Sequence, residues 1–391
     1  MHHAEIARVF EADGPFTSLY LDTEGDVEQA AELVALRWKN ARGAMLAAGV
    51  PVATVNAVGP LVAGSHTAGA TLAVIAGRQG PRYSANLPER PPRDILLRHG
   101  PLPDLVPLLA GRQAAVAHVA VLTDRTGADM AARVADDVTA ERVSGRDTPY
   151  IHKPQAGGWS QPRYHHRAEA IWESNAAEVA DALTRLVDQV RPRFVAAAGD
   201  VRALQLLREH APKRVRELLT GVGGEYPSLD AVFAEADKLV AATVEADNRA
   251  LLERFAAELG QAAGAPGPLA VEGAEATLAA LGRSQVETLL LTGLFLDDER
   301  TAWFGPAPTD LAVDRDALVG LGVAEPEPVK GRLVDVAVRA ALGTGADVRV
   351  LDPADQTRPA AGRGATHDAP APPEHAPAEG LGALLRFAVG T

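Results

Sequence analysis

The sequence predicts an α/β protein built from three domains. Its 391 residues exceed what one ordinary hydrophobic core supports, so two or three domains are expected. Apolar runs of strand length alternate with long stretches whose apolar residues recur about every 3.6 positions. A Gly/Pro-rich segment that begins at Ala262 is typical of a linker. We therefore expect domains at residues 1–112, 113–262 and 268–391.

The first predicted domain has a mixed sheet. Residues 16–22 have strand character after a Gly-Pro turn, and residues 71–76 form a short buried strand. Between them, residues 27–48 carry apolar side chains at helical spacing, and Gly49 is the expected stop. Six prolines between residues 80 and 104 predict that this stretch is mostly irregular.

The second predicted domain contains a β-hairpin and a long helix. Residues 115–122 and the segment after Gly127 are the two expected strands, with the glycine in the turn. Apolar positions keep a helical period from about Arg163 to Val190, and Pro192 ends this helix. The remaining expected elements are a strand, the N-cap of a following helix and another long amphipathic helix: 194–199, Asp200 and 232–259.

The third predicted domain contains a sheet of the parallel type. Residues 285–292 are an apolar strand, and a helix at 334–342 and a strand at 347–351 follow it. Proline and alanine dominate the next tract, which predicts a disordered insertion at 353–379. Residues 380–389 return to strand character, so we expect them to dock into the same sheet.

Composition narrows the classes of protein that remain. The chain has no cysteine, which excludes disulfides, thiolate metal sites and cysteine nucleophiles and fits a reducing compartment. The N-terminus lacks the basic and apolar regions of a signal peptide. No apolar run reaches the ~18 residues of a spanning helix. We expect a soluble cytoplasmic protein with no membrane partner.

Charge is distributed unevenly along the chain. The net charge of −13 argues against general nucleic-acid binding, and no DNA partner is expected. Residues 266–391 carry 18 acidic against 10 basic side chains. Residues 142–167 have the opposite balance, with five lysines and arginines against Asp147 alone. A basic segment therefore belongs to an otherwise acidic protein.

Residues 150–167, the tip loop, are the candidate working part. Gly157 and Gly158 leave the backbone free to adopt positive φ and to approach a partner closely. The Gln161 amide can donate and accept hydrogen bonds, and the long helix that follows would serve as a stalk. Cations and histidines flank the glycines and suit a phosphate-rich surface, so the candidate binding residues are Lys153, Gly157, Gly158, Trp159, Ser160, Arg163, His165, His166 and Arg167. An ordinary flexible surface loop is the alternative interpretation.

No motif for a cofactor or a metal accompanies this loop. The glycine-rich fragments elsewhere lack the strand–turn–helix setting of a nucleotide site. His165 and His166 are adjacent, so on a helix they point about 100° apart and do not converge on one metal ion. Ser160 lacks the Gly-x-Ser-x-Gly frame of a serine hydrolase, and residues 297–300 are expected to form a solvated turn. We expect neither a cofactor nor a metal.

The chain resembles the bacterial branch of the archaeo-eukaryotic release factor and Pelota superfamily. The resemblance lies in the hairpin at 119–126 with the tip loop and its helix, in residues 285–351, and in the ending Gly382-Ala-Leu-Leu-Arg-Phe387. The branch includes actinobacterial dormancy-associated proteins, whose N-terminal region resembles residues 16–49, and the ribosome hibernation factor Balon. The resemblance implies a release-factor-like middle domain at 113–262 and an α/β sandwich as the C-terminal domain.

Two departures from the family pattern stand out. Trp159 and Ser160 separate the glycine pair from Gln161, whereas the family's tip is Gly-Gly-Gln. Residues 1–113 contain neither an Asn-Ile-Lys-Ser motif nor a cysteine-containing stop-codon motif. Reading of stop codons is therefore not expected.

The resemblance implies a ribosome-binding, tRNA-mimicking factor that contacts rRNA and occupies the A site of idle or stalled ribosomes. Such a factor would act in hibernation or translation silencing as part of a stress response. Its acidic C-terminal domain would meet an elongation-factor GTPase. Two alternatives stay open: a peptidyl-tRNA hydrolase that rescues ribosomes with Gln161 as the catalytic residue, and a stress-induced binding protein without a ribosomal role.

Overall fold

The protein folds into two compact α/β units, as seen in a computed structural model. Unit 1 comprises residues 1–114 and 244–391, and unit 2 comprises residues 115–243. The α/β fold class predicted from the sequence is confirmed, and the division into three domains stays a prediction. The structure describes residues 4–23, 30–63, 70–134, 137–144, 161–224, 226–260, 268–293, 295–323, 327–351 and 376–388.

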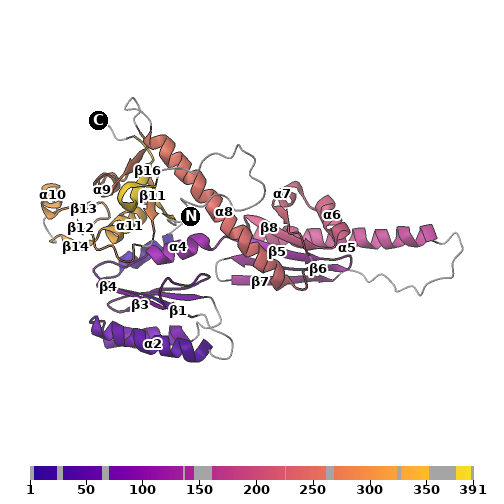
Figure 1. The fold of residues 1–391 in the computed structure, drawn as a ribbon, viewed down its shortest axis with the longest axis horizontal. Helices are drawn as coiled ribbons and strands as arrows, with labels where there is room; N and C mark the ends of the chain where they lie inside the picture. The colour runs from indigo at the N-terminus through magenta and orange to yellow at the C-terminus, as the bar shows by residue number, and fades with distance from the viewer. Residues whose placement is uncertain are drawn as a thin grey trace. The chain divides into compact units, whose positions relative to one another are not determined.

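Unit 2 is a five-stranded mixed sheet between two layers of helices (Figure 1). The strand order is β7-β6-β5-β8-β9, in which β8 runs parallel to both of its neighbours and the other pairs are antiparallel. The elements are β5 (His118–Thr123), β6 (Gly127–Val134), β7 (Asp137–Ser144), α5 (Gln161–Val190), β8 (Phe194–Gly199), α6 (Val201–His210), α7 (Lys213–Arg216), β9 (Leu219–Gly221) and α8 (Leu229–Leu259), whose second half belongs to unit 1.

Alternating side chains of the strands fill the two faces of this sheet. Val119 and Val121 of β5 point to the face that α5, α6 and α7 cover, where they pack with Leu183 and Leu207. Ala120 points to the opposite face, which is covered by α8. The predicted hairpin, both long helices, β8 and the cap by Asp200 are confirmed. Sequence reasoning did not find β7.

The N-terminal segment of unit 1 is a four-stranded sheet of order β3-β2-β1-β4. One face is covered by α2 and α3, and the other belongs to a core that includes α4 and the C-terminal segment. Its elements are α1 (Ala4–Ala7), the 3-10 helix η1 (Arg8–Glu11), β1 (Phe16–Asp22), α2 (Ala30–Ala47), α3 (Val52–Ala63), β2 (Thr71–Gly77), β3 (Gly80–Leu87), β4 (Ile95–Gly100) and α4 (Val106–Ala114).

Two expectations for this segment are wrong. Its sheet is entirely antiparallel, not mixed, because two helices in succession return the chain from β1 to β2 in the opposite direction. Residues 80–104 contain β3 and β4 and are not mostly irregular. The prolines leave these strands intact because Pro81 lies at a register shift of the edge strand β3, and the others lie outside the strands. The predicted stop at Gly49 is confirmed by its φ of 83°.

The C-terminal segment of unit 1 contains a mixed sheet of order β10-β16-β11-β15, with β11 parallel to β15 as predicted. Alternate leucines of β11 pack against α9 and α11 on one face and against the end of α8 on the other. A small sheet of order β13-β12-β14 was not expected. The elements are β10 (Ala270–Glu272), α9 (Ala274–Gly282), β11 (Val286–Thr292), β12 (Thr301–Phe304), β13 (Leu311–Ala312), α10 (Arg315–Gly320), β14 (Val329–Arg332), α11 (Leu333–Gly343), β15 (Asp347–Leu351), the 3-10 helix η3 (Ala378–Gly380) and β16 (Leu381–Leu385).

Buried polar contacts join the two segments of unit 1. Arg332 lies 3.2 Å from carboxylate oxygens of both Asp104 and Asp335, and Arg98 lies 3.3 Å from Asp104. Gln113 donates a hydrogen bond to the Val350 carbonyl and accepts one from its N–H, each 3.0 Å long. Charged groups of this kind persist in a core only when they are paired.

The structure describes the predicted turn at 297–300 and only the last residues of the predicted insertion at 353–379. In the expected turn at 297–300, Asp297 and Glu299 are exposed while Asp298 and Arg300 are half-buried, and Asp297 accepts two hydrogen bonds of 2.9 and 3.0 Å from Arg93. The predicted insertion at 353–379 lies outside the described residues except for 376–379, which lead through η3 into the predicted last strand, β16.

Candidate functional site

The structure describes only the second part of the tip loop. Lys153, Gly157, Gly158, Trp159 and Ser160 lie outside the described residues. Gln161 is the first described residue of α5, so the remaining candidates lie in the first two turns of that helix: Gln161, Arg163, His165, His166 and Arg167. Pro162 is compatible with this start because the N–H that proline lacks would have no acceptor in a first helical turn.

Helix α5 is anchored to unit 2 by only part of its length. Its first buried residues are Asn175 and Ala176, and its main packing residues, such as Leu183 and Leu186, lie further on. Glu169 and Ala170, upstream of them, are exposed. About 20 Å of helix backbone precedes Asn175, the first buried residue among the described side chains of α5, at 1.5 Å per residue. Figure 1 shows this end of α5 extending past the other elements of unit 2.

A cluster of polar and aromatic side chains holds α5 where it leaves the sheet. The Arg125 cluster consists of Arg125, Trp172, Asn175 and Asp200. The Arg125 guanidinium carbon lies 4.4 Å from the centroid of the Trp172 ring. The same guanidinium contacts the Asp200 carboxylate at 3.2 and 3.3 Å. Asn175 donates a 3.0 Å hydrogen bond to the backbone carbonyl of Arg125. One residue of the hairpin turn thus binds α5 and the start of α6.

The turn that carries Arg125 is itself well fixed. The Asp124 carboxylate accepts hydrogen bonds from the backbone N–H groups of Thr126 (2.6 Å) and Gly127 (2.9 Å). The Asp124 N–H donates to the Gly127 carbonyl at 3.0 Å. An aspartate at the start of a turn commonly accepts hydrogen bonds in this way from the N–H groups that follow it. Arg125 therefore projects from a rigid turn.

Asp200 connects the Arg125 cluster to the secondary structure. Its carboxylate accepts hydrogen bonds from the N–H groups of Arg202 (2.9 Å) and Ala203 (3.0 Å), so it caps α6. Partial burial would raise the pKa of Asp200, but the hydrogen bonds from Arg125 and from these N–H groups outweigh burial and lower it. The carboxylate is therefore ionised at neutral pH.

The strands that end at this cluster approach each other closely. Gly199, the last residue of β8, has a φ of 125°, and a Cβ atom there would lie 1.8 Å from the Thr123 carbonyl oxygen. The N–H of Asp200 donates to the same carbonyl at 3.0 Å. Only glycine fits at this position. The close approach sets the place of Asp200 relative to the hairpin.

The free end of α5 has an unusual charge for a helix start. The first turn contains no acidic residue, and Arg163 and Arg167 add positive charge to the positive end of the helix dipole. Cations at this end are unfavourable for helix stability by roughly 0.3–1 kcal/mol each. A helix start with cations nearby attracts phosphate, because the N–H groups of the first turn and the positive charges both favour an anion. The site is thus suited to binding anions.

Sequence reasoning found α5 and the cations at its start but missed the Arg125 cluster. Its members lie in the hairpin turn, in α5 and at the end of β8, and only the cap by Asp200 has a local sequence signal. Among the described residues, no group of three or more His, Asp or Glu side chains is placed to hold a metal ion. In the same part of the chain, no helix is long and apolar enough to cross a membrane.

Comparison with known proteins identifies the class to which this site belongs. Residues 117–261, which include every strand and helix from β5 to α8, match the model of bacterial archaeo-eukaryotic release factor family 2. Residues 117–261 are therefore similar to the bacterial archaeo-eukaryotic release factors. The predicted resemblance to bacterial archaeo-eukaryotic release factors is confirmed. The closer likeness to dormancy-associated proteins and to Balon stays a prediction.

Relatives of this release-factor-like chain occur in Mycobacterium tuberculosis. The uncharacterized proteins MT2704 (strain CDC 1551 / Oshkosh) and Rv2629 (strain ATCC 25618 / H37Rv) are each 28% identical to it over 396 residues. The alignments cover 99% of this chain and 97% of each relative. The similarity therefore extends over both units and not only over residues 117–261.

Three solved structures are among those to which the chain is similar. An archaeal translation termination factor is 15% identical, with a TM-score of 0.24 and coverage of 98% of this chain and 96% of that one. Pelota from Archaeoglobus fulgidus is 14% identical, with a TM-score of 0.34 and coverage of 82% and 81%. Dom34 from S. cerevisiae, a termination-like factor that interacts with Hbs1, is 9% identical, with a TM-score of 0.37 and coverage of 96% and 81%.

Proposed function

We propose that this release-factor-like chain is a ribosome-binding, tRNA-mimicking factor that occupies the A site of idle or stalled ribosomes. In this proposal, unit 2 presents the tip loop and the start of α5 to rRNA near the peptidyl transferase centre, and the result is hibernation or translation silencing under stress. The family match of unit 2 supports the class of protein. The 30-residue length of α5 supports the mode of binding.

The observation that carries the proposal is the charge at the start of α5. Arg163, His165, His166 and Arg167 lie in the first two turns, although cations there oppose the helix dipole. A sequence selected only for stability would place acidic residues at these positions. The cost to the helix is offset if the same groups bind rRNA phosphates.

Cosedimentation with 70S ribosomes tests this proposal. The variant Arg163→Ala/His165→Ala/His166→Ala/Arg167→Ala should lose ribosome binding and keep or gain thermal stability, because it removes cations from the positive end of a helix. A control variant changes three exposed cations of unit 1, Arg42→Ala/Arg283→Ala/Lys330→Ala, and should bind like wild type. Wild-type protein that fails to cosediment would contradict the proposal and favour a stress-induced binding protein without a ribosomal role.

Peptidyl-tRNA hydrolysis is the second candidate function, and the place of Gln161 favours it. Gln161 opens α5 three residues after Gly158, and an amide side chain is able to orient a water molecule. Release of labelled peptide from ribosome-bound peptidyl-tRNA decides between the two. A Gln161→Ala variant that releases peptide at the wild-type rate would remove Gln161 from the chemistry.

An elongation-factor GTPase is the proposed protein partner of the C-terminal domain at 268–391. The support is its charge, since residues 266–391 carry 18 acidic against 10 basic side chains and are poorly suited to contact RNA. Copurification of a GTPase with ribosomes that carry this chain tests the proposal. Charge reversal at the exposed Asp316 and Glu327 should weaken that association without affecting ribosome binding.

A further inference from the structure

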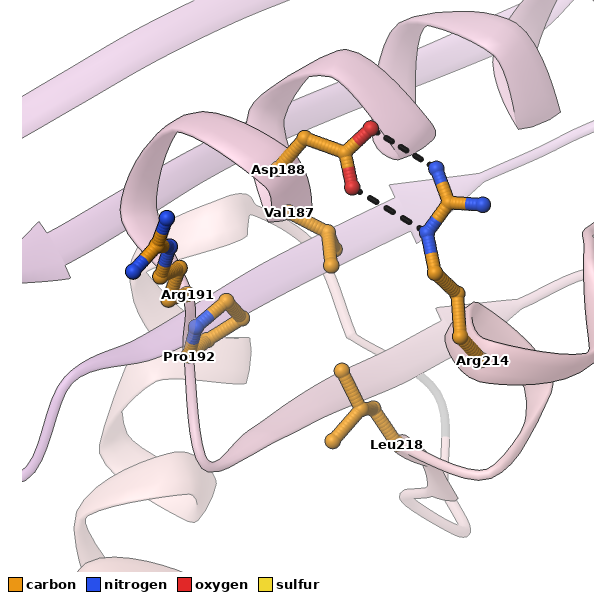
Figure 2. A pocket seen from close by; sticks show the side chains of 6 residues that line it. All are labelled: Val187, Asp188, Arg191, Pro192, Arg214 and Leu218. Carbon is orange, nitrogen blue, oxygen red and sulfur yellow. Dashed lines mark hydrogen bonds and ion pairs between the residues drawn. The ribbon is translucent and has the colours of Figure 1, made fainter.

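An open depression lies at the end of α5 that is opposite to the tip loop. Figure 2 shows its lining, which comes from α5, the turn after it, α7 and the residue before β9. The volume is about 490 Å³, and the lining residues are Val187, Asp188, Arg191, Pro192, Arg214 and Leu218. Arg214 donates to the Asp188 carboxylate at 3.1 and 2.7 Å. Arg191 is exposed, and its side chain has no hydrogen bond or ion pair with another described residue.

A second depression of about 450 Å³ lies between α6 and α7. Arg208 of α6 and Arg216 of α7 line it together with Val201, Leu204, Gln205 and Glu209. Both arginines are exposed, and within the described part of the chain their side chains have no charge partner. Helix α7 thus contributes Arg214 to one depression and Arg216 to the other.

The two depressions form a region of concentrated positive charge, the basic edge. Residues 191–216 contain seven arginines and lysines against two acidic residues, in a chain whose net charge is −13. The stretch of α5 between the tip loop and the basic edge has the opposite balance, with five acidic residues against Arg185 between 168 and 190. Two separate basic regions therefore lie at the ends of α5, about 40 Å apart at 1.5 Å per residue.

The fold does not require this charge. Three of the four residues of α7 are cationic, and like charges so close on a helix repel one another. The pairs Arg214–Asp188 and Lys213–Glu217 relieve part of the repulsion. Among the described residues, Arg191, Arg208 and Arg216 have no such ion pair, so their charge is better explained by a ligand than by stability.

We propose that the basic edge binds the phosphate backbone of RNA. Spaced arginines on open surfaces are the usual contacts to phosphate, because the guanidinium fork matches its oxygens and remains charged at all relevant pH values. An acidic protein partner would need an apolar contact area as well. Among the described residues of 191–216, Val201 is the one large apolar side chain that is strongly exposed, at 83%. This inference goes beyond the proposed function, since it concerns the other end of α5 and does not require a ribosome.

Binding of the full chain to a fluorescein-labelled RNA duplex of about 20 base pairs tests the inference. Fluorescence anisotropy is measured from about 50 to 200 mM KCl, and the logarithm of the binding constant is plotted against that of the salt concentration. The variant Arg191→Gln/Arg208→Gln/Arg216→Gln should bind at least about tenfold more weakly at low salt and lower the slope by about 2 to 3, close to one unit per phosphate contact. Its thermal unfolding should match wild type.

The control variant Arg42→Gln/Arg283→Gln/Lys330→Gln removes the same charge from exposed positions of unit 1 and should bind the duplex like wild type. Equal slopes for the basic-edge variant and wild type would overturn the inference. Failure of the wild-type chain to bind the duplex would also overturn it. A third contrary result would be a basic-edge variant that loses binding to poly-glutamate, a polyanion without phosphate, but keeps binding to RNA. Loss of duplex binding only in the Arg163/His165/His166/Arg167 variant would also overturn it and leave the proposed function intact.

Discussion

The guanidinium carbon of Arg125 lies 4.4 Å from the ring centroid of Trp172, and this contact ties the β5–β6 turn to α5. It occurs where the packed part of α5 gives way to the part that precedes the first buried residue. Because Arg125 also pairs with Asp200, one side chain aligns the helix with both the hairpin and α6. The direction of α5 relative to the sheet of unit 2 therefore depends on the Arg125 cluster.

Replacing Arg125 should loosen the start of α5 without unfolding unit 2. Arg125→Ala removes a partly exposed cation–π contact and ion pair, so the free energy of unfolding should fall by about 1–2 kcal/mol. Hydrogen exchange of α5 amides upstream of Asn175 should accelerate. Arg185→Ala is the control, because its ion pair with Glu141 is 3.5 Å long and exposed. Equal changes in the two variants would contradict the role given to Arg125.

Two substitutions at Asp200 separate its cap from its ion pair. Asp200→Ala loses both, and denaturant unfolding should show a loss of about 1–2 kcal/mol. Asp200→Asn keeps an oxygen that can accept from the N–H groups of α6, so it should lose at most about half as much. If the asparagine variant were as unstable as the alanine variant, the cap would not be the main contribution of this residue.

A methyl group at Gly199 should disrupt unit 2. Its Cβ atom would lie 1.8 Å from the Thr123 carbonyl, at a φ of 125°. We expect Gly199→Ala to lose about 4 kcal/mol or more, which is the scale of a severe core clash. Gly223→Ala is a matched control because no atom lies within 4 Å of its Cβ position. Thermal unfolding that is equal in the two variants would contradict this account of the strand ends.

Carboxylates with opposite pKa shifts should give opposite pH dependences of stability. Burial, together with the neighbouring Asp104 charge, raises the pKa of Asp335 well above its usual value. Its favourable contribution is therefore complete below the unfolded pKa of about 3.9 and is lost as pH rises through the folded pKa. The hydrogen bond from Arg254 lowers the pKa of Glu287. Its contribution is present above about pH 4.3 and is lost as pH falls through the folded pKa.

Urea unfolding at several pH values measures this contrast. The unfolding free energy of wild type minus that of Asp335→Asn should decrease as pH rises from about 4 towards neutrality. The same difference for Glu287→Gln should increase over the acidic range. If both differences changed with pH in the same direction, the environment of Asp335 would not be the buried, shared one seen around Arg332.

Much of the fold follows from local sequence signals, and the candidate site follows only in part. The 3.6-residue period identifies α5, and the Gly127 turn identifies the β5–β6 hairpin, because both patterns are local. The pair Arg125–Asp200 joins residues 75 positions apart, and no pattern in the sequence marks it. Prolines misled the prediction for residues 80–104, because an edge strand tolerates Pro81 where a central strand would not.

The charge pattern of the sequence predicted only one of the two basic regions, because only local clusters are visible in a sequence. The cations of the tip loop are close together in the sequence and therefore visible there. The cations of the basic edge come from the turn after α5, from α6 and from α7, and only the fold places them around two depressions.

A density map of the full chain bound to the 70S ribosome is the decisive measurement. The proposed function predicts density for unit 2 in the A site, with residues 150–160 and the first turns of α5 at the peptidyl transferase centre. A chain bound elsewhere on the ribosome, or bound in the A site with the start of α5 facing solvent, would contradict it.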